Sequence, residues 1–144
     1  MKRILILSAS LLLLFTVWYY WSHPLKTSVI INNYRFYVEL ALTDSEKERG
    51  LGFRDSLALN QGMLFVWDHK EIFPFWMKGM RFPIDIIWIA DTTIVDITHS
   101  APVVTNGRYV TYPPQVPVNK VLEINAGLAQ QYGISEGDTI TIVH

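Results

Sequence analysis

Polar side chains interrupt three apolar segments of this sequence, and they are the residues best placed to bind a ligand. Side chains alternate between the two faces of a strand, so residues two positions apart share a face. Trp76 and Lys78 therefore share one face of their segment, and Glu123 and Asn125 share one face of another. Asp85 is the single charge in a third. Because a buried carboxylate is costly unless paired, we expect Asp85 to lie at the solvent-exposed end of its strand or to meet a cation.

These side chains, together with one arginine from a nearby turn, form a candidate ligand site. A tryptophan can supply a flat apolar surface, and charged and amide groups around it can supply directional hydrogen bonds. This mixture is typical of a site for a small polar or sugar-like ligand. The candidate ligand-binding residues are Arg54, Trp76, Lys78, Asp85, Glu123 and Asn125.

A purely structural role for the same residues stays open. An ion pair between Lys78 and Asp85 across a hairpin, a pair between Glu46 and Arg49 on one helix, and a buried Trp76 would account for them without a ligand. Convergence of the six candidates on one concave surface would favour a binding site. Dispersal would favour a structural role.

An enzyme is the alternative function, as a hydrolase or lyase that uses a carboxylate pair. Such enzymes need two carboxyl groups of different pKa about 5 to 10 Å apart, and Asp85 and Glu123 are the available pair. The neighbouring cations Arg49, Arg54 and Lys78 would lower both pKa values rather than separate them. We therefore favour a binding module over an enzyme and assign no catalytic residue.

Established motifs for cofactors, metals and nucleophiles are absent from the sequence. It contains no G-x-S-x-G, H-E-x-x-H or Walker-type glycine loop, and its four histidines lack a ligand-like spacing. The absence of cysteine excludes disulfides, thiolate chemistry and cysteine-ligated metals. We expect neither a cofactor nor a metal site.

The elements that must position the candidate residues are mostly short strands. Each apolar run is four to nine residues long and rich in β-branched or aromatic residues, which favours strands over helices. Asn32-Asn33 and Asp91-Thr92-Thr93 have the composition of hairpin turns. The predicted strands span residues 28–31, 34–42, 63–67, 73–77, 84–90, 94–98, 120–124 and 138–143.

Two short helices complete the predicted elements. Thr43 and Glu46 have the spacing of a capping box, and Gly50 ends that helix. A second helix is expected over 126–132, and a proline-rich loop over 101–118. Many short strands with two short helices predict a mainly β protein, a single mostly antiparallel sandwich or barrel.

Four sequence blocks carry a family resemblance: ERGLGFRDSL at 48–57, GMLFVW at 62–67, FWMKGMRFPIDIIWI at 75–89 and VLEINAGLAQQYGISEGDTI at 121–140. Through these blocks the sequence resembles the domain of unknown function 192 (DUF192) family, over about residues 28–144. The resemblance implies a β-sandwich of jelly-roll type with short helices, and it brings no established activity or substrate. Gly52 and Gly79 stand where the family usually has Met and Asn.

The first segment has the composition of a membrane anchor. Residues 4–21 form an uncharged run of 18 residues, which is long enough to span a bilayer as a helix. Lys2 and Arg3 precede the run, and bulky aromatic residues rather than a small-residue cleavage site end it. We expect an uncleaved signal anchor with linker over 1–26, with a cleaved signal as the alternative. The domain at 27–144 would then be extracytoplasmic, in the periplasm or on the cell surface.

Composition narrows the partners. The 144 residues carry a net charge of −1, and without the first 21 residues, 10 basic and 13 acidic side chains leave −3. Nucleic acid is not expected as a partner, because phosphate binding needs a concentrated basic surface. The expected partners are the membrane, through residues 4–21, and a small polar ligand or an envelope protein bound by the proline-rich loop. The sequence thus predicts a membrane-anchored extracytoplasmic binding or accessory module.

Overall fold

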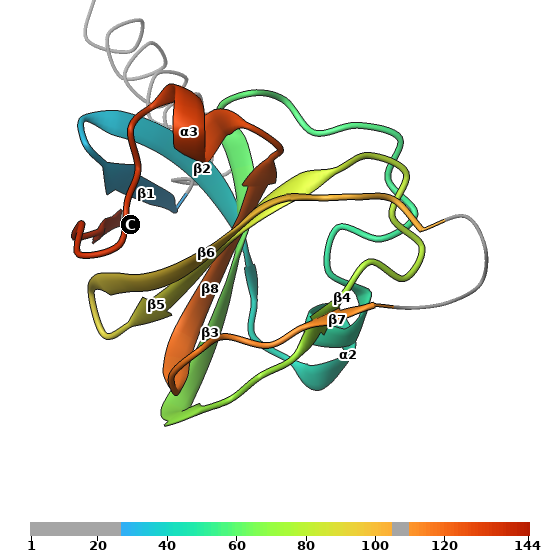
Figure 1. The fold of residues 1–144 in the computed structure, drawn as a ribbon, viewed down its shortest axis with the longest axis horizontal. Helices are drawn as coiled ribbons and strands as arrows, with labels where there is room; N and C mark the ends of the chain where they lie inside the picture. Colours follow the sequence, from blue (N-terminus) through green and yellow to red (C-terminus); the bar gives the residue numbers. More distant parts are fainter. Residues whose placement is uncertain (1–26, 105–109) are drawn as a thin grey trace, which may run out of the picture.

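The computed structural model describes residues 27–104 and 110–144 (Figure 1). The predicted membrane segment at residues 4–21 lies outside this part of the chain. Within the described residues, no helix has the length and apolarity needed to cross a bilayer.

Seven strands form one sheet in the order β6-β5-β8-β3-β2-β1-β9. All neighbouring strands in it are antiparallel except β2 and β3, which are parallel. Two further strands pair in a separate small sheet, and the described residues also contain two short helices. The elements are β1 (Ser28–Ile31), β2 (Tyr34–Ala41), α2 (Asp44–Arg49), β3 (Gln61–Glu71), β4 (Phe75–Trp76), β5 (Ile84–Ala90), β6 (Thr93–Ala101), β7 (Thr111–Tyr112), β8 (Val118–Asn125), α3 (Leu128–Gln131) and β9 (Thr141–Val143).

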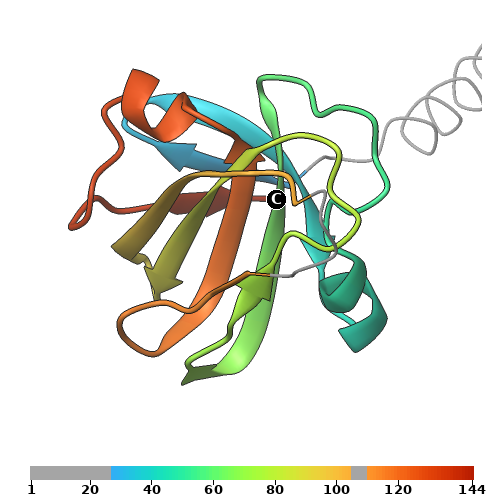
Figure 2. The same cartoon turned by 45° about the vertical axis from the view of Figure 1, so that its right-hand side comes forward.

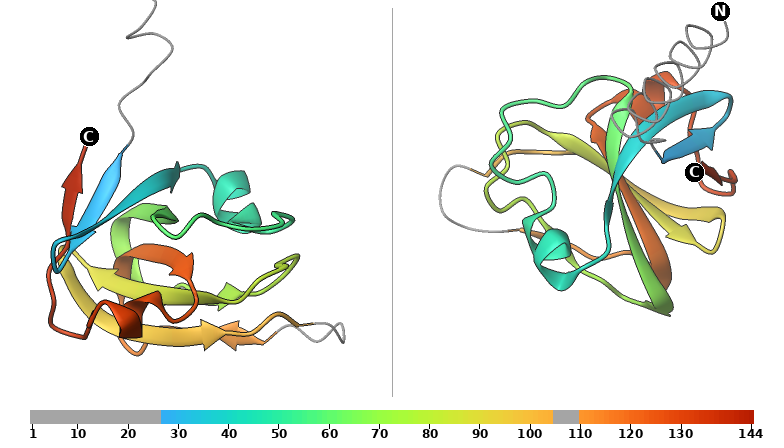
Figure 3. Two further views of the ribbon diagram at one scale, coloured as in Figure 1. Left: turned by 90° about the horizontal axis from the view of Figure 1, so that it is seen from above. Right: turned by 180° about the vertical axis from the view of Figure 1, so that it is seen from behind.

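The seven-stranded sheet curls into a half-barrel, as the view from above in Figure 3 shows. The segment before β9 reaches the opposite edge of the sheet, where the Ile94 N–H donates to the Asp138 carbonyl at 2.9 Å and the Ile140 N–H donates to the Thr92 carbonyl at 2.8 Å. These bonds join the two edges of the sheet at one end. The prediction of a mainly β, mostly antiparallel domain with two short helices is confirmed, and the sheet is one curled layer.

Local sequence signals explain several of these elements. Asn32 and Asn33 have φ values of 48° and 68°, which the tight β1–β2 hairpin requires. Thr43 accepts a hydrogen bond from the Glu46 N–H, and the Glu46 side chain accepts one from the Thr43 N–H, so the predicted capping box begins α2.

Element lengths differ from the prediction where pairing is irregular. β3 continues to Glu71, because its pairing with β8 resumes at Glu71 and Val118 after a bulge. The polar sequence after Trp67 conceals this extension. β4 has only two residues, since it follows Pro74, which cannot donate a backbone hydrogen bond.

Apolar side chains pack on both faces of the sheet and form two cores. The α3-side core contains Leu64, Ile87 and Leu122 and is covered by α3. The α2-side core contains Phe65, Trp88 and Val121 and is covered by the segments around α2 and β4. Figures 1 and 2 show α2 and α3 at opposite ends of the molecule. Alternation along β3, β5 and β8 therefore sends successive side chains into different cores.

Candidate functional site

A cavity of about 230 Å³ lies on the α2 side of the sheet, between α2, β3, β4 and β8. Its volume is just below the roughly 300–1,000 Å³ of sites for drug-sized molecules, so it suits a ligand of about one ring. We call it the α2-side pocket. It is lined by Lys47, Glu48, Arg49, Gly50, Leu51, Phe65, Trp67, Phe73, Pro74, Phe75, Trp76, Lys78, Met80 and Glu123.

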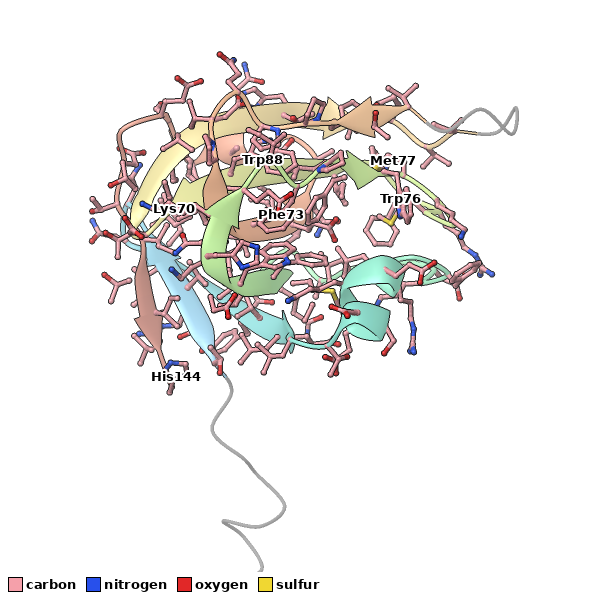
Figure 4. The ribbon with its side chains drawn as sticks, turned by 90° about the horizontal axis from the view of Figure 1, so that it is seen from below. Lys70, Phe73, Trp76, Met77, Trp88 and His144 are labelled. Atoms are coloured by element: carbon pink, nitrogen blue, oxygen red, sulfur yellow. The ribbon has the colours of Figure 1, made fainter. Side chains whose placement is uncertain are left out.

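Aromatic side chains from β3 and the β3–β4 connection form the wall of the pocket. The rings of Trp67 and Phe73 stack with centroids 4.0 Å apart, and Phe75 meets Phe65 edge to face at 4.8 Å. Such mutual packing fixes ring positions, so the wall is preformed. Trp76 is different, because 42% of it is exposed. Figure 4 shows Trp76 at the space between β4 and α2.

Helix α2 places charged groups at the rim. None of its residues is buried, and its last turn supplies Lys47, Glu48 and Arg49 to the pocket. The Lys47 Nζ lies 4.7 Å from the Trp67 ring centroid, and the Lys78 Nζ lies 5.5 Å from the Trp76 centroid. Lys78 also lies 3.8 Å from the Glu48 carboxylate. The rim therefore carries three cations and one anion.

Glu123 supplies a buried carboxyl group to the pocket. Its residue is 4% exposed, and its carboxylate accepts a hydrogen bond from the Leu51 N–H. Its Oε2 atom has no hydrogen-bond partner among the residues that the structure describes. Burial raises the pKa of Glu123 to about 8, against the opposing effects of the Leu51 hydrogen bond and the charge of Arg54. At pH 7 the group is therefore mainly a neutral acid that can donate a hydrogen bond.

Gly50 leaves open the space next to this carboxyl group. The glycine ends α2 with a φ of 52°, a left-handed conformation that disfavours side chains. A Cβ atom at this position would lie 3.5 Å from Glu123 Oε2. The missing side chain thus leaves room beside Oε2, which is itself buried.

The structure brings together three of the six predicted site residues: Trp76, Lys78 and Glu123 line the α2-side pocket. Arg54 instead forms a bidentate ion pair with Glu39, at 2.6 and 2.7 Å. Asn125 shares the strand face of Glu123, but its amide donates to the carbonyls of Leu57 and Ala58 at 3.0 and 3.2 Å. Arg54 and Asn125 therefore support the surroundings rather than line the pocket.

Asp85 lies on the opposite face of the sheet, with no exposed area. Its carboxylate accepts hydrogen bonds from the N–H groups of Ser100 at 2.8 Å, Gly127 at 3.0 Å and Ala129 at 2.9 Å. The expectation that Asp85 lies at an exposed strand end or meets a cation is wrong, because three backbone donors satisfy it instead. The alternative ion pair with Lys78 is also not formed, and Glu48 is the partner of that lysine.

The carboxylate pair required for hydrolase or lyase chemistry is not assembled. Asp85 pairs in register with Ile124, and Glu123 with Ile86, so the two carboxyl groups point to opposite faces. Within the described residues, no group of three or more histidine, aspartate or glutamate side chains is placed to hold a metal ion.

The aromatic wall and α2 are the parts of the site that sequence reasoning missed. Trp67 lies two positions after the buried Phe65 on β3, so both side chains share one face of the strand. This spacing could have indicated that Trp67 lies on the same face of the sheet as Glu123. The contribution of Lys47 had no comparable signal, because α2 meets the pocket through the tertiary fold alone.

Comparison with known proteins identifies a family and two similar structures. The DUF192 model, described as "Uncharacterized ACR", matches residues 27–142. A "putative transcription regulator" from Sinorhizobium meliloti 1021 is 32% identical with a TM-score of 0.73, over 81% of this chain and 92% of that chain. A protein of unknown function from Novosphingobium aromaticivorans DSM 12444 is also 32% identical with a TM-score of 0.73, over 83% and 89%. Among curated proteins, none matches this chain.

Proposed function

This chain belongs to the DUF192 family, and we propose that its domain is a binding module that holds a small polar, sugar-like ligand in the α2-side pocket. The observation that carries the proposal is the buried carboxyl group of Glu123, whose Oε2 atom has no partner and borders a cavity with aromatic walls. An unsatisfied buried polar group costs about 1–3 kcal/mol. A ligand that forms a hydrogen bond with Oε2 supplies the partner that the described residues do not supply.

The rest of the pocket suits recognition. Trp76 offers an exposed indole face, and Lys78 stands beside it with a charged group. Few polar groups among aromatic walls are the usual composition of a small-molecule site, in which the apolar surface supplies affinity and the polar groups supply orientation. Binding requires no second carboxyl group, whereas the hydrolase or lyase alternative requires Asp85 beside Glu123. The geometry therefore supports binding better than catalysis.

A ligand screen on the full-length chain in lipid nanodiscs tests the proposal. Sugars, organic acids, amines and metal ions are tested for a rise in Tm, and positive compounds are then titrated by calorimetry, because a ligand that prefers the folded state stabilises it. We expect at least one ring-containing compound to bind wild type and to lose affinity with Trp76→Ala. Arg81→Gln, on the exposed surface, is the matched control. If no compound distinguishes wild type from Trp76→Ala, the proposal fails.

We also propose that residues 4–21 anchor the domain to a membrane and leave it outside the cytoplasm. The basic start, the uncharged run and the aromatic end of the segment support this placement. Alkaline phosphatase fused after His144 is active only when exported, so an active fusion in the membrane fraction is expected. An inactive fusion, or one released by a carbonate wash, would contradict the anchor.

An envelope protein is the second candidate partner, through the proline-rich loop. Strand β7 lies within this loop and pairs with β4, so Thr111 lies opposite Trp76. A partner bound there would contact the pocket wall directly. Nucleic acid is not proposed, although one neighbour is described as a regulator of transcription, because the chain after residue 21 has a net charge of −3.

A further inference from the structure

We propose that the ligand of the α2-side pocket is a small ring-bearing organic acid. Its carboxylate would lie at the rim among Lys47, Arg49 and Lys78, its ring against Trp76, and a hydroxyl or carbonyl oxygen against Glu123. This inference rests on the proposed function and narrows it to one chemical class. Acidic sugars and aromatic hydroxy acids share this chemistry, and the experiment below separates them.

The charges at the rim select the sign of the ligand. Lys47 and Arg49 come from α2, and Lys78 follows β4, so cations flank the pocket from two different elements. Glu48 is the single acidic residue in this rim, and it lies 3.8 Å from Lys78. Arg49 forms no ion pair with any described residue, which leaves its guanidinium available to a ligand carboxylate. The net positive rim attracts an anion and repels an ammonium group.

The carboxyl group of Glu123, at the buried end of the pocket, determines which chemical group of the ligand can bind there. The Leu51 N–H already donates to the Glu123 carboxyl, and Oε2 remains unpartnered. Oε2 is itself buried, and its neighbour Gly50 has no side chain that would separate it from a ligand group in the pocket. A protonated carboxyl group donates a hydrogen bond, so it matches an acceptor oxygen on the ligand. A cationic ligand would instead require Glu123 to ionise in a site where burial opposes its charge.

Aromatic side chains line the pocket between its charged rim and the buried carboxyl group of Glu123. Phe75 and Trp67 are held in the preformed wall, and Trp76 leaves 42% of its area exposed. A cavity of about 230 Å³ accommodates a single ring with short substituents. A flat ring with an oxygen on one side and a carboxylate on the other fits this order of groups.

Matched acids and amines test the inference by calorimetry on the full-length chain in nanodiscs at pH 7. The aromatic probes are 4-hydroxyphenylacetate, tyramine and phenylacetate, and the sugar probes are glucuronate, glucosamine and glucose. We expect at least one acid to bind about tenfold or more tightly than its amine. Phenylacetate, which lacks the inner hydroxyl, should bind several-fold more weakly than 4-hydroxyphenylacetate if the aromatic acid is the ligand. The relative affinities of 4-hydroxyphenylacetate and glucuronate show whether the ring of the ligand is aromatic or a sugar.

Variants locate the effect in the pocket. Arg49→Gln and Lys78→Gln should each weaken the bound acid about three- to tenfold, while Lys70→Gln, whose lysine pairs with Asp91 elsewhere, should leave it unchanged. Raising the pH from 7 to 9 ionises Glu123 and should weaken binding to wild type. The other charged groups around it are Lys47, Glu48, Arg49 and Lys78 at the pocket rim and Arg54 next to it. Glu123→Gln keeps a hydrogen-bond donor, so its affinity should not follow pH.

Each result supports or overturns the inference. Tyramine or glucosamine binding as tightly as the matched acid would overturn it and leave the proposed function standing. Failure of all six probes, when the broader screen has found a ligand that depends on Trp76 and carries no acid group, would likewise overturn the acid class alone. Failure of every compound in both experiments would overturn the proposed function, and this inference with it.

Discussion

The two faces of the sheet each bury one carboxyl group, and the protein treats them in opposite ways. On the α3 side, Asp85 accepts three backbone hydrogen bonds within 3.0 Å. On the α2 side, Glu123 keeps one oxygen without a partner beside a cavity. Both residues are almost wholly buried, at 0% and 4% exposure, so burial alone does not separate them. The difference lies in the hydrogen-bond partners that the protein provides for each carboxyl group.

This contrast assigns different tasks to the two faces. Asp85 joins β5 to the end of β6 and to the start of α3, at Ser100, Gly127 and Ala129, and so contributes to the structure. Glu123 joins only to Leu51 and faces a helix that buries none of its own residues. Stability is expected to depend on the α3 side, and ligand recognition on the α2 side. Substitutions at matched positions can break or sharpen this division.

The largest expected effect is the loss of stability in Asp85→Ala. Hydrogen bonds to a charged group contribute about 1.5–3 kcal/mol each, and this substitution removes three at once, so the free energy of unfolding should fall by about 4.5 kcal/mol or more. Urea denaturation followed by circular dichroism measures it. Asp55→Ala, at an exposed ion pair, should change stability by less than about 1 kcal/mol. Equal effects of the two substitutions would remove the structural role of Asp85.

Glu123→Gln should have the opposite sign, and its effect should depend on pH. The pKa of Glu123 is about 8 in the folded chain and ordinarily 4.5. Below pH 4.5 Glu123 holds its proton in both the folded and the unfolded chain, so its contribution to stability is fully present. Between pH 4.5 and 8 the unfolded chain releases the proton first, and stability falls by up to about 1.4 kcal/mol per pH unit. It is lost as the pH passes through 8.

Glutamine does not titrate, so Glu123→Gln should be more stable than wild type by up to about 5 kcal/mol at pH 9 and nearly equal to it at pH 4. Urea midpoints at the two pH values measure the difference. A carboxyl group that destabilises the fold at alkaline pH and is nevertheless present is consistent with a role in binding. A variant that is less stable than wild type at pH 9 would place Glu123 among the structural residues, with Asp85.

Trp76→Ala should separate binding from stability. The indole is 42% exposed, so its removal should change the free energy of unfolding by less than about 1 kcal/mol. Aromatic stacking contributes about 0.5–1.5 kcal/mol beyond the area buried, and the affinity for a ring-bearing ligand should therefore fall about tenfold. Calorimetry measures the affinity, and Trp76→Phe, which keeps an aromatic face, should retain most of it. Unchanged affinity in Trp76→Ala would exclude this residue as the stacking surface.

Local sequence rules predicted the parts of the fold that neighbouring residues determine. The Asn32-Asn33 hairpin and the Thr43–Glu46 capping box are both present, since each depends on a few consecutive residues. Strand alternation likewise predicted that Glu123 and Leu122 point to opposite faces of their strand. The closure of the sheet by the segment before β9 joins residues more than 40 positions apart, and no local pattern encodes it.

The sequence predicted only part of the candidate site, because the rest depends on contacts between residues far apart in the chain. Alternation states that Asp85 and Ile86 face opposite ways, but it does not state which face also carries Glu123. That relation depends on the register between β5 and β8, which sets Asp85 beside Ile124. Similarly, α2 reaches the pocket because the chain passes from β2 over the sheet before it enters β3 as a parallel neighbour. Such long-range placement requires the structure.

The smallest expected effect concerns Asn125, which shares a strand face with Glu123 and lies outside the pocket. Its amide donates to the carbonyls of Leu57 and Ala58, so it ties the loop before β3 to the end of β8. Asn125→Ala should lower the free energy of unfolding by about 0.5–1.5 kcal/mol, the usual net contribution of a hydrogen bond. Ligand affinity should stay within twofold of wild type. A tenfold loss of affinity with unchanged stability would move Asn125 into the binding site and would extend the α2-side pocket toward this loop.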